Sequence, residues 1–286
     1  NTTANASLSA GSNLQFAYRI EAQDLQLIKY GSSTAEKMTL GFWVKATKTG
    51  TNIIELYQGD SNRSVSVAYT VSVTNTWEFK IVDIPADTGG TMDNNSGIGL
   101  EIIWWVVAGT DFTSGSLQTS WGTNTATARA VGQVNNADST SNNFHVTGVR
   151  LEVGEYTSAT LPPFRHESYG ANLQRCARYF WWTGGGSAYQ FHGTGVEVSA
   201  TAGYINVPLI NSFRSSPSFT LVDALVLYDG DGESAVTSLG NVYYSAHGSL
   251  VNIGCVASGG GLGNGNGLVV YSNADSDSGF QISAEL

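Results

Sequence analysis

The stretch "SVSVAYTVSV" (residues 64–73) alternates strictly between apolar and small polar side chains. Successive side chains of a β-strand point to opposite faces, so this alternation places all the apolar residues on one side. That side carries Val65, Val67, Tyr69, Val71 and Val73. A strand with one apolar and one polar face is typical of an antiparallel sheet that covers a core on one side. The stretch therefore predicts an antiparallel β-protein.

The segments around it extend this interpretation. "WEFKIVDI" (77–84) alternates in the same way, and the short "TNT" between the two segments predicts that residues 64–84 form a β-hairpin. In "NFHVTGVRLEV" (143–153) the apolar positions change parity across Gly148, which predicts a β-bulge there.

Two further segments depart from clean alternation. "MTLGFWVKA" (38–46) leaves Trp43 on the face opposite its apolar set. "IGLEIIWWVV" (98–107) is apolar on both faces. Because an apolar face is unstable in water, something must cover the second face of this strand.

Composition and charge restrict the possible partners. The chain has 286 residues, 34 of them glycine, and only 13% are charged, which is typical of a turn-rich β-protein. Its formal net charge is -10, so it lacks the basic field that sequence-independent nucleic-acid binding requires. Cys176 and Cys255 show no metal-ligand spacing; we expect buried free thiols, with a disulfide between them as the alternative.

The ends and the hydropathy of the chain bear on its attachment. No apolar run reaches the length that spans a bilayer, so we expect no membrane insertion. The chain starts with the polar "NTTANASLSAGSN" (1–13) rather than Met, and we expect it to be the C-terminal part of a longer protein.

One stretch, "LPPFRHESYGANLQRCARYFWW" (161–182), has helical rather than strand-like spacing. Its two prolines stop the preceding strand, and Ser168 is a suitable N-cap for a helix. One helical stripe would then carry Tyr169, Leu173, Cys176, Ala177 and Phe180. So short a helix is marginal in isolation, so we expect it to dock on a sheet or on copies of itself. The sequence predicts an all-β chain with a β-sandwich over 1–160, this linker and helix over 161–182, and a second, smaller β-sandwich over 183–286.

The junction "GVRLEVGEYTSATLPPFRHESYGANLQRCARYF" (148–180) resembles one found in bacteriophage tail-fibre and related virion proteins. Upstream, "YRIEAQDLQLIKYGSSTAEKMTLGFWVKATKTG" (18–50) is similar to the jelly-roll domain that precedes this junction, a fold similar to carbohydrate-binding modules. Together the matching stretches cover roughly residues 15–180. The final hundred residues resemble these proteins only in their general pattern of short strands and Gly-rich turns.

The resemblance implies a homotrimeric virion component that binds a host-surface glycan during adsorption and joins other virion proteins through an N-terminal part outside this chain. In such a trimer we expect four residues at subunit interfaces: Ile103, Trp105, Leu173 and Phe180. It also suggests a structural calcium site at Glu21 and Glu152, the one cofactor that we consider. A capsid decoration or head-fibre protein is the alternative, and a polysaccharide depolymerase is a further one.

The candidate binding residues are aromatic. Sugars stack their C–H faces on aromatic rings, so surplus aromatic side chains mark a glycan site. The candidates are Trp43, Trp121, Tyr243 and Tyr244, although for Trp43 we favour packing against a neighbouring element. We expect the terminal region, including its 258–267 loop, to recognise the host. No carboxylate pair, nucleophile motif or metal spacing stands out, so we predict that the protein is not an enzyme.

Overall fold

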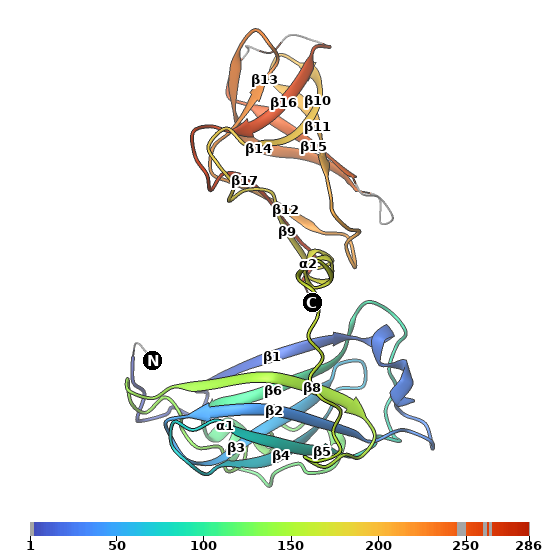
Figure 1. Cartoon of the computed structure of the whole chain (residues 1–286), viewed down its shortest axis with the longest axis vertical. Helices are drawn as coiled ribbons and strands as arrows, with labels where there is room; N and C mark the ends of the chain where they lie inside the picture. The colour runs from blue at the N-terminus through green and yellow to red at the C-terminus, as the bar shows by residue number, and fades with distance from the viewer. Residues whose placement is uncertain (1–2, 245–249, 260–261, 263–264, 286) are drawn as a thin grey trace. The chain divides into compact units, whose positions relative to one another are not determined.

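The structure is a computed structural model that describes residues 3–244, 250–259, 262 and 265–285 (Figure 1). The chain forms two compact units, Asn1–Arg165 and His166–Leu286. Antiparallel strands dominate both units, which confirms the all-β class. Among the described residues, no helix has the length and apolar character needed to cross a membrane.

The first unit is a β-sandwich of two antiparallel sheets, an arrangement consistent with a jelly roll. One sheet has the order β1-β6-β3-β4-β7 and the other the order β5-β2-β8. The strands of the first sheet are β1 (Asn13–Glu21), β3 (Gly50–Gln58), β4 (Arg63–Val71), β6 (Ile98–Ala108) and β7 (Gly122–Thr123). Those of the second are β2 (Met38–Ala46), β5 (Glu78–Ile84) and β8 (Phe144–Val153). Three short helical segments connect them: η1 (Ala22–Ile28), α1 (Thr110–Thr113) and η2 (Ala126–Ala128).

The core of this unit lies between the two sheets and follows the alternation of the strands. Val65, Tyr69 and Val71 of β4 are buried there, as the opening stretch predicted, while Val73 lies beyond the strand and is exposed. Phe42 of β2 meets Tyr69 edge-on, with ring centroids 5.2 Å apart. Full burial of each such large apolar side chain stabilises the fold by about 1.5–3 kcal/mol.

The predicted hairpin over 64–84 is wrong. β4 pairs with β3 and β7, whereas β5 pairs with β2 in the opposite sheet. The connection between them crosses from one sheet to the other and is held by Glu78, whose Oε1 accepts the backbone N–H groups of Ser72 and Val73 at 2.8 and 2.9 Å. Alternation identifies each strand but carries no information about its partner.

The predicted bulge at Gly148 is confirmed. The β2–β8 register shifts between Gly41 and Trp43, where Trp43 pairs with Thr147. Gly148 has φ +60°, a left-handed conformation that favours glycine. A Cβ atom at this position would lie only 3.2 Å from Cδ1 of Trp43, so the site also lacks room for a larger residue.

The second face of β6 is covered by the same chain, which corrects the interface prediction for Ile103 and Trp105. Both side chains are almost fully buried in a small cluster with Ile53, Ala108 and Ala130. Phe112 and Leu117, from the segment after β6, pack against this cluster. Trp105 also donates its indole N–H to Glu55 Oε2 at 3.0 Å. Neither residue is available to another subunit.

The second unit is a closed barrel with a separate three-stranded sheet, which corrects the expected second β-sandwich while the all-β class holds. The barrel has the order β10-β11-β15-β14-β13-β16, and the three-stranded sheet has the order β12-β17-β9. The barrel strands are β10 (Phe191–Ser199), β11 (Ala202–Pro208), β13 (Leu225–Tyr228), β14 (Glu233–Tyr244), β15 (Leu250–Ala257) and β16 (Gly267–Ser272). The sheet strands are β9 (Phe180–Trp182), β12 (Ser218–Val222) and β17 (Gly279–Ser283). The barrel closes because β10 pairs with β16. Side chains alternate between inward and outward positions in a barrel as they do in a sandwich, so the sequence pattern does not distinguish the two.

The predicted helix is α2 (Tyr169–Ala177), and Ser168 caps it by accepting the N–H of Ala171 at 3.3 Å. It ends before Phe180, which starts β9. The helix belongs to the second unit, because Asn211 Nδ2 donates to the carbonyl of Gln174 at 3.0 Å. Both thiols are free, as expected, and Cys255 is buried. Cys176 is exposed, which corrects the expectation of burial.

Candidate functional site

The first unit opens where the edge strands of its two sheets meet. β1 is at the edge of one sheet and β8 at the edge of the other, and Phe16 and Phe144 bring them together with ring centroids 6.1 Å apart. Phe16 and Tyr18 alternate toward the inner face of β1, where their β6 partners Trp104 and Ile102 are buried. Phe16 and Tyr18 nevertheless remain exposed. The sandwich therefore presents apolar side chains to solvent along this edge.

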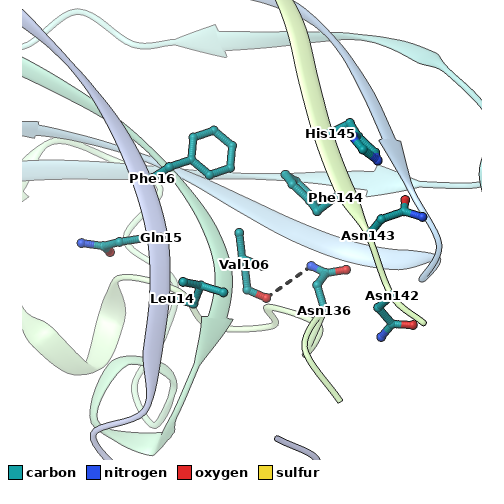
Figure 2. Close-up of a pocket in the computed structure, with 9 residues that line it drawn as sticks. All are labelled: Leu14, Gln15, Phe16, Val106, Asn136, Asn142, Asn143, Phe144 and His145. Atoms are coloured by element: carbon teal, nitrogen blue, oxygen red, sulfur yellow. Dashed lines mark hydrogen bonds between the residues drawn. The ribbon is translucent and has the colours of Figure 1, made fainter. Parts of the chain in front are cut away.

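A pocket of about 370 Å³ lies at this opening (Figure 2). Its walls come from β1, from β6, from the start of β8 and from the loop before β8. It is lined by Leu14, Gln15, Phe16, Val106, Asn136, Asn142, Asn143, Phe144 and His145. The volume falls within the range of about 300–1,000 Å³ that is typical of ligand sites.

Aromatic rings form the apolar part of the pocket. Phe16 stacks on Trp104 with a centroid separation of 5.4 Å and 10° between the ring planes. Trp104 is held in the core, where Phe42 meets it edge-on at 5.9 Å. Phe16 remains 41% exposed, so part of its ring is accessible to a ligand. The orientation of this accessible ring is therefore set by a buried partner.

Side-chain amides form the polar part, and hydrogen bonds hold them. Asn136 donates from Nδ2 to Asn52 Oδ1 at 2.7 Å and to the Val106 carbonyl at 3.3 Å, the bond drawn in Figure 2. Asn142 donates from Nδ2 to Asp138 Oδ1 at 2.7 Å. The backbone of Asn143 is tied to Thr47, whose Oγ1 accepts its N–H at 3.1 Å. Hydrogen bonds to neighbouring residues therefore fix the positions of these asparagines.

The lining is suited to a neutral ligand with both an apolar face and hydroxyl groups. Among its described residues it contains aromatic, aliphatic and amide side chains and one imidazole, His145, but no carboxylate, lysine or arginine. Amides both donate and accept hydrogen bonds, as hydroxyl recognition requires. Aromatic faces with a few placed polar groups are the arrangement by which proteins hold sugar rings.

The predicted glycan residues of the first unit lie elsewhere. Trp43 is exposed on the outer face of β2 and contacts Phe79, with ring centroids 5.3 Å apart. Trp121 has a packing role instead: its Nε1 donates to the Pro85 carbonyl at 2.7 Å and its ring meets Tyr30 edge-on at 5.6 Å. The glycan assignment of Trp121 is therefore corrected.

The two tyrosines predicted in the second unit behave differently from each other. Tyr243 is exposed and its ring lies 5.9 Å from that of Tyr204. Tyr244 packs against Phe213 and accepts the Phe213 N–H on its hydroxyl at 2.9 Å, so it is a packing residue and its assignment is corrected. The 258–267 loop lies partly outside the described residues.

The remaining predicted residues are not brought together. Glu21 ends β1 in one sheet and accepts Gln23 Nε2 at 2.7 Å, while Glu152 lies on β8 in the other sheet and pairs with Arg150 at 3.3 Å. Within the described ranges no group of three or more His, Cys, Asp or Glu residues is placed to hold a metal ion. Of the interface candidates in the second unit, Leu173 is half-buried and Phe180 is at the limit of exposure.

Sequence reasoning missed the pocket residues Phe16, Phe144 and Asn143. The available signal was the alternation of "NLQFAYRIE" (13–21), which carries large apolar residues at every second position, together with the Asn-rich turn before β8.

No family model matches this chain. No curated protein matches it either.

Proposed function

We propose that this chain is the glycan-binding part of a bacteriophage fibre and that the β1–β8 pocket holds a neutral sugar of the host surface. The observation that carries the proposal is Phe16, an accessible ring whose orientation is set by buried Trp104 and which faces a rim of amides. The sandwich architecture, which is consistent with a jelly roll, agrees with the resemblance to carbohydrate-binding modules. The resemblance supplies the virion context.

The chemistry of the pocket favours binding over cleavage. Glycoside hydrolysis generally uses two carboxyl groups about 5–10 Å apart on either side of the scissile bond. The described pocket lining offers no carboxyl group. The sugar is therefore held by stacking and hydrogen bonding, and the protein acts as an adsorption component rather than a depolymerase.

We also propose that the chain assembles as a homotrimer. The support comes from α2, where Tyr169 and Cys176 of the predicted apolar stripe are exposed and only Ala177 is buried. A short amphipathic helix whose apolar stripe is only partly covered gains stability when a partner covers the rest.

A glycan array tests binding, and labelled protein on host cells tests adsorption. The intact chain is expected to bind neutral glycans on the array and to stain cells, and Phe16→Ala is expected to weaken both signals strongly. If the chain stained particles but neither cells nor glycans, the decoration role would stand in place of the adsorption role.

A further inference from the structure

The outer surface of the barrel carries a cluster of aromatic side chains that the proposed function leaves unused. Tyr271 of β16 is at its centre, with the rings of Tyr189 and Phe191 at centroid distances of 6.2 and 6.1 Å. Tyr189 is 61% exposed and Phe191 is 67% exposed. Single exposed rings are common, but a contiguous group of exposed rings is typical of an interaction site.

Strand pairing holds the cluster in place. Phe191 pairs with Tyr271 between β10 and β16, and Tyr228 lies on the next strand, β13, one diagonal step from Tyr271. Tyr189 is tied to β16, because its backbone N–H donates to the Ser272 carbonyl at 3.0 Å. The four rings, Tyr189, Phe191, Tyr228 and Tyr271, therefore form one surface, called here the aromatic patch.

A carboxylate borders the aromatic patch. Glu233 of β14 pairs with Tyr228, and its Oε1 accepts the Tyr271 hydroxyl at 2.5 Å. Burial, followed by this hydrogen bond and the charge of Glu233, raises the pKa of Tyr271 to about 12. The phenol therefore stays neutral and donates its hydroxyl proton in the hydrogen bond to Glu233. The patch thus combines electron-rich ring faces with a fixed negative charge.

The surrounding charge has the same sign. Residues 183–286 contain one basic residue, Arg214, and eight acidic ones. Arg214 donates from Nη1 to the Ala284 carbonyl at 2.9 Å, at the end of the three-stranded sheet rather than on the barrel. Asp229 and Asp231, in the turn that joins β13 to β14, add negative charge beside Glu233. Such a field attracts cations and repels anions.

We propose that the aromatic patch binds an organic ammonium group, most simply a quaternary ammonium such as choline. Aromatic faces attract cations through their quadrupoles, and grouped rings recognise quaternary ammonium groups in this way. The Glu233 carboxylate adds ionic attraction for the same cation. A neutral sugar could stack on these rings and hydrogen-bond to Glu233, but only a cation also gains the cation–π and ionic attraction that the patch offers. The proposal does not depend on the pocket of the first unit or on its ligand.

Calorimetric titration of the full chain with choline chloride tests the proposal, with 3,3-dimethylbutan-1-ol as the neutral ligand of the same shape. Choline is expected to bind about tenfold or more tightly than the alcohol, because only choline has the cation–π and ionic contributions. Equal affinity for the two ligands, or no choline binding, would overturn the proposal. Phosphatidylcholine vesicles form a second arm: co-sedimentation assigns the source to a lipid surface, and binding of free choline alone assigns it to a soluble or polymer-borne ammonium.

Matched variants locate the site. Phe191→Ala and Glu233→Gln are each expected to weaken choline binding at least about fivefold, since each removes one part of the cation's environment. Tyr243→Ala is the control, because Tyr243 is an equally exposed tyrosine, at 59%, on the same barrel but outside the patch. Unchanged thermal unfolding would show that the variants are folded. Loss of binding in Tyr243→Ala, or full binding in Phe191→Ala, would place the ligand elsewhere.

Discussion

The ring of Phe16 is nearly parallel to the ring of Trp104, with ring centroids 5.4 Å apart and 10° between the ring planes. Trp104 is 2% exposed and belongs to the core, whereas Phe16 stands at the open edge of the sandwich. The pair therefore links a rigid interior to an accessible surface, and the ring that a ligand would meet is already oriented. Such preorganisation reduces the entropy lost on binding.

Replacing Phe16 with alanine is expected to abolish stacking in the pocket and to weaken glycan binding by about tenfold or more, on the scale of a lost aromatic contact. The effect on folding is expected to be smaller than the cost of about 3–5 kcal/mol for truncating a fully buried aromatic residue. Calorimetry with the best glycan from the array measures the first effect, and urea unfolding measures the second.

Tyr18→Ala provides the matched control for this experiment. Tyr18 lies on the same face of β1 and is also exposed, but it does not line the pocket. Binding is expected to persist in this variant. If both variants lost binding equally, the ligand would follow the whole edge of β1 rather than the pocket.

The fold class could be predicted because alternation is a local property that burial on one face imposes directly. Val65, Tyr69 and Val71 were identified as core residues, and Gly148 as a bulge, from residue order alone. Strand partners depend on contacts between distant segments, so the partner of β5 was assigned incorrectly. The same limit concealed the barrel, whose closure joins β10 to β16.

The binding site was harder to predict because the sequence pattern of an apolar strand residue is the same whether its side chain is buried or faces a pocket. Trp105 and Trp121 both stand out in the sequence as surplus aromatic residues. Trp105 is buried, however, and Trp121 donates its indole N–H to the Pro85 carbonyl. Phe16 has the pattern of an ordinary strand residue, yet it is exposed at the edge of the sandwich, where β1 and β8 are the edge strands of the two sheets. Exposure of this kind is a tertiary property.

Arg129 is expected to be essential for the stability of the first unit. Glu55 is fully buried, and its carboxylate accepts Arg129 Nε at 2.9 and 3.0 Å and the indole N–H of Trp105 at 3.0 Å. Arg129→Met would leave a buried, unpaired carboxylate, for which the expected cost is about 3–5 kcal/mol. Glu55→Gln in the same background should recover part of the loss, because it removes the charge. Urea unfolding of the three proteins measures both effects.

The same pair predicts a pH dependence. Burial raises the pKa of Glu55 even though Arg129 opposes the shift. A carboxyl group whose pKa is raised by folding binds its proton more tightly in the folded state, so its contribution to stability falls as the pH rises above its ordinary value of about 4.3. Without Arg129 this loss should grow, and the stability gap between wild type and Arg129→Met should widen from pH 4 to pH 7. A constant gap would contradict the assignment.

Asp87 is expected to show the opposite pH dependence. It accepts Arg63 Nε and Nη2 at 2.6 and 2.9 Å and the Tyr30 hydroxyl at 2.6 Å. Burial alone would raise the pKa of Asp87, but these hydrogen bonds outweigh it and the pKa is lowered. The stabilisation is therefore present above the ordinary aspartate value of about 3.9 and is lost as the pH falls below it. Asp87→Asn should destabilise the protein at pH 7, and its difference from wild type should shrink toward pH 2 in urea unfolding.

The exposed part of the α2 stripe makes the proposed trimer testable through Cys176. In a single chain Cys176 is exposed and Cys255 is buried, so a monomer has one rapidly reacting thiol. If the stripes of three helices pack together, Cys176 is expected to react slowly with a maleimide, and light scattering should give three times the chain mass of 30.2 kDa. Leu173→Asp would place a charge in that contact and should restore both fast labelling and the monomer mass, because an unpaired charge opposes burial. A wild-type monomer with a fast thiol at micromolar concentration would rule out the helix as an assembly surface.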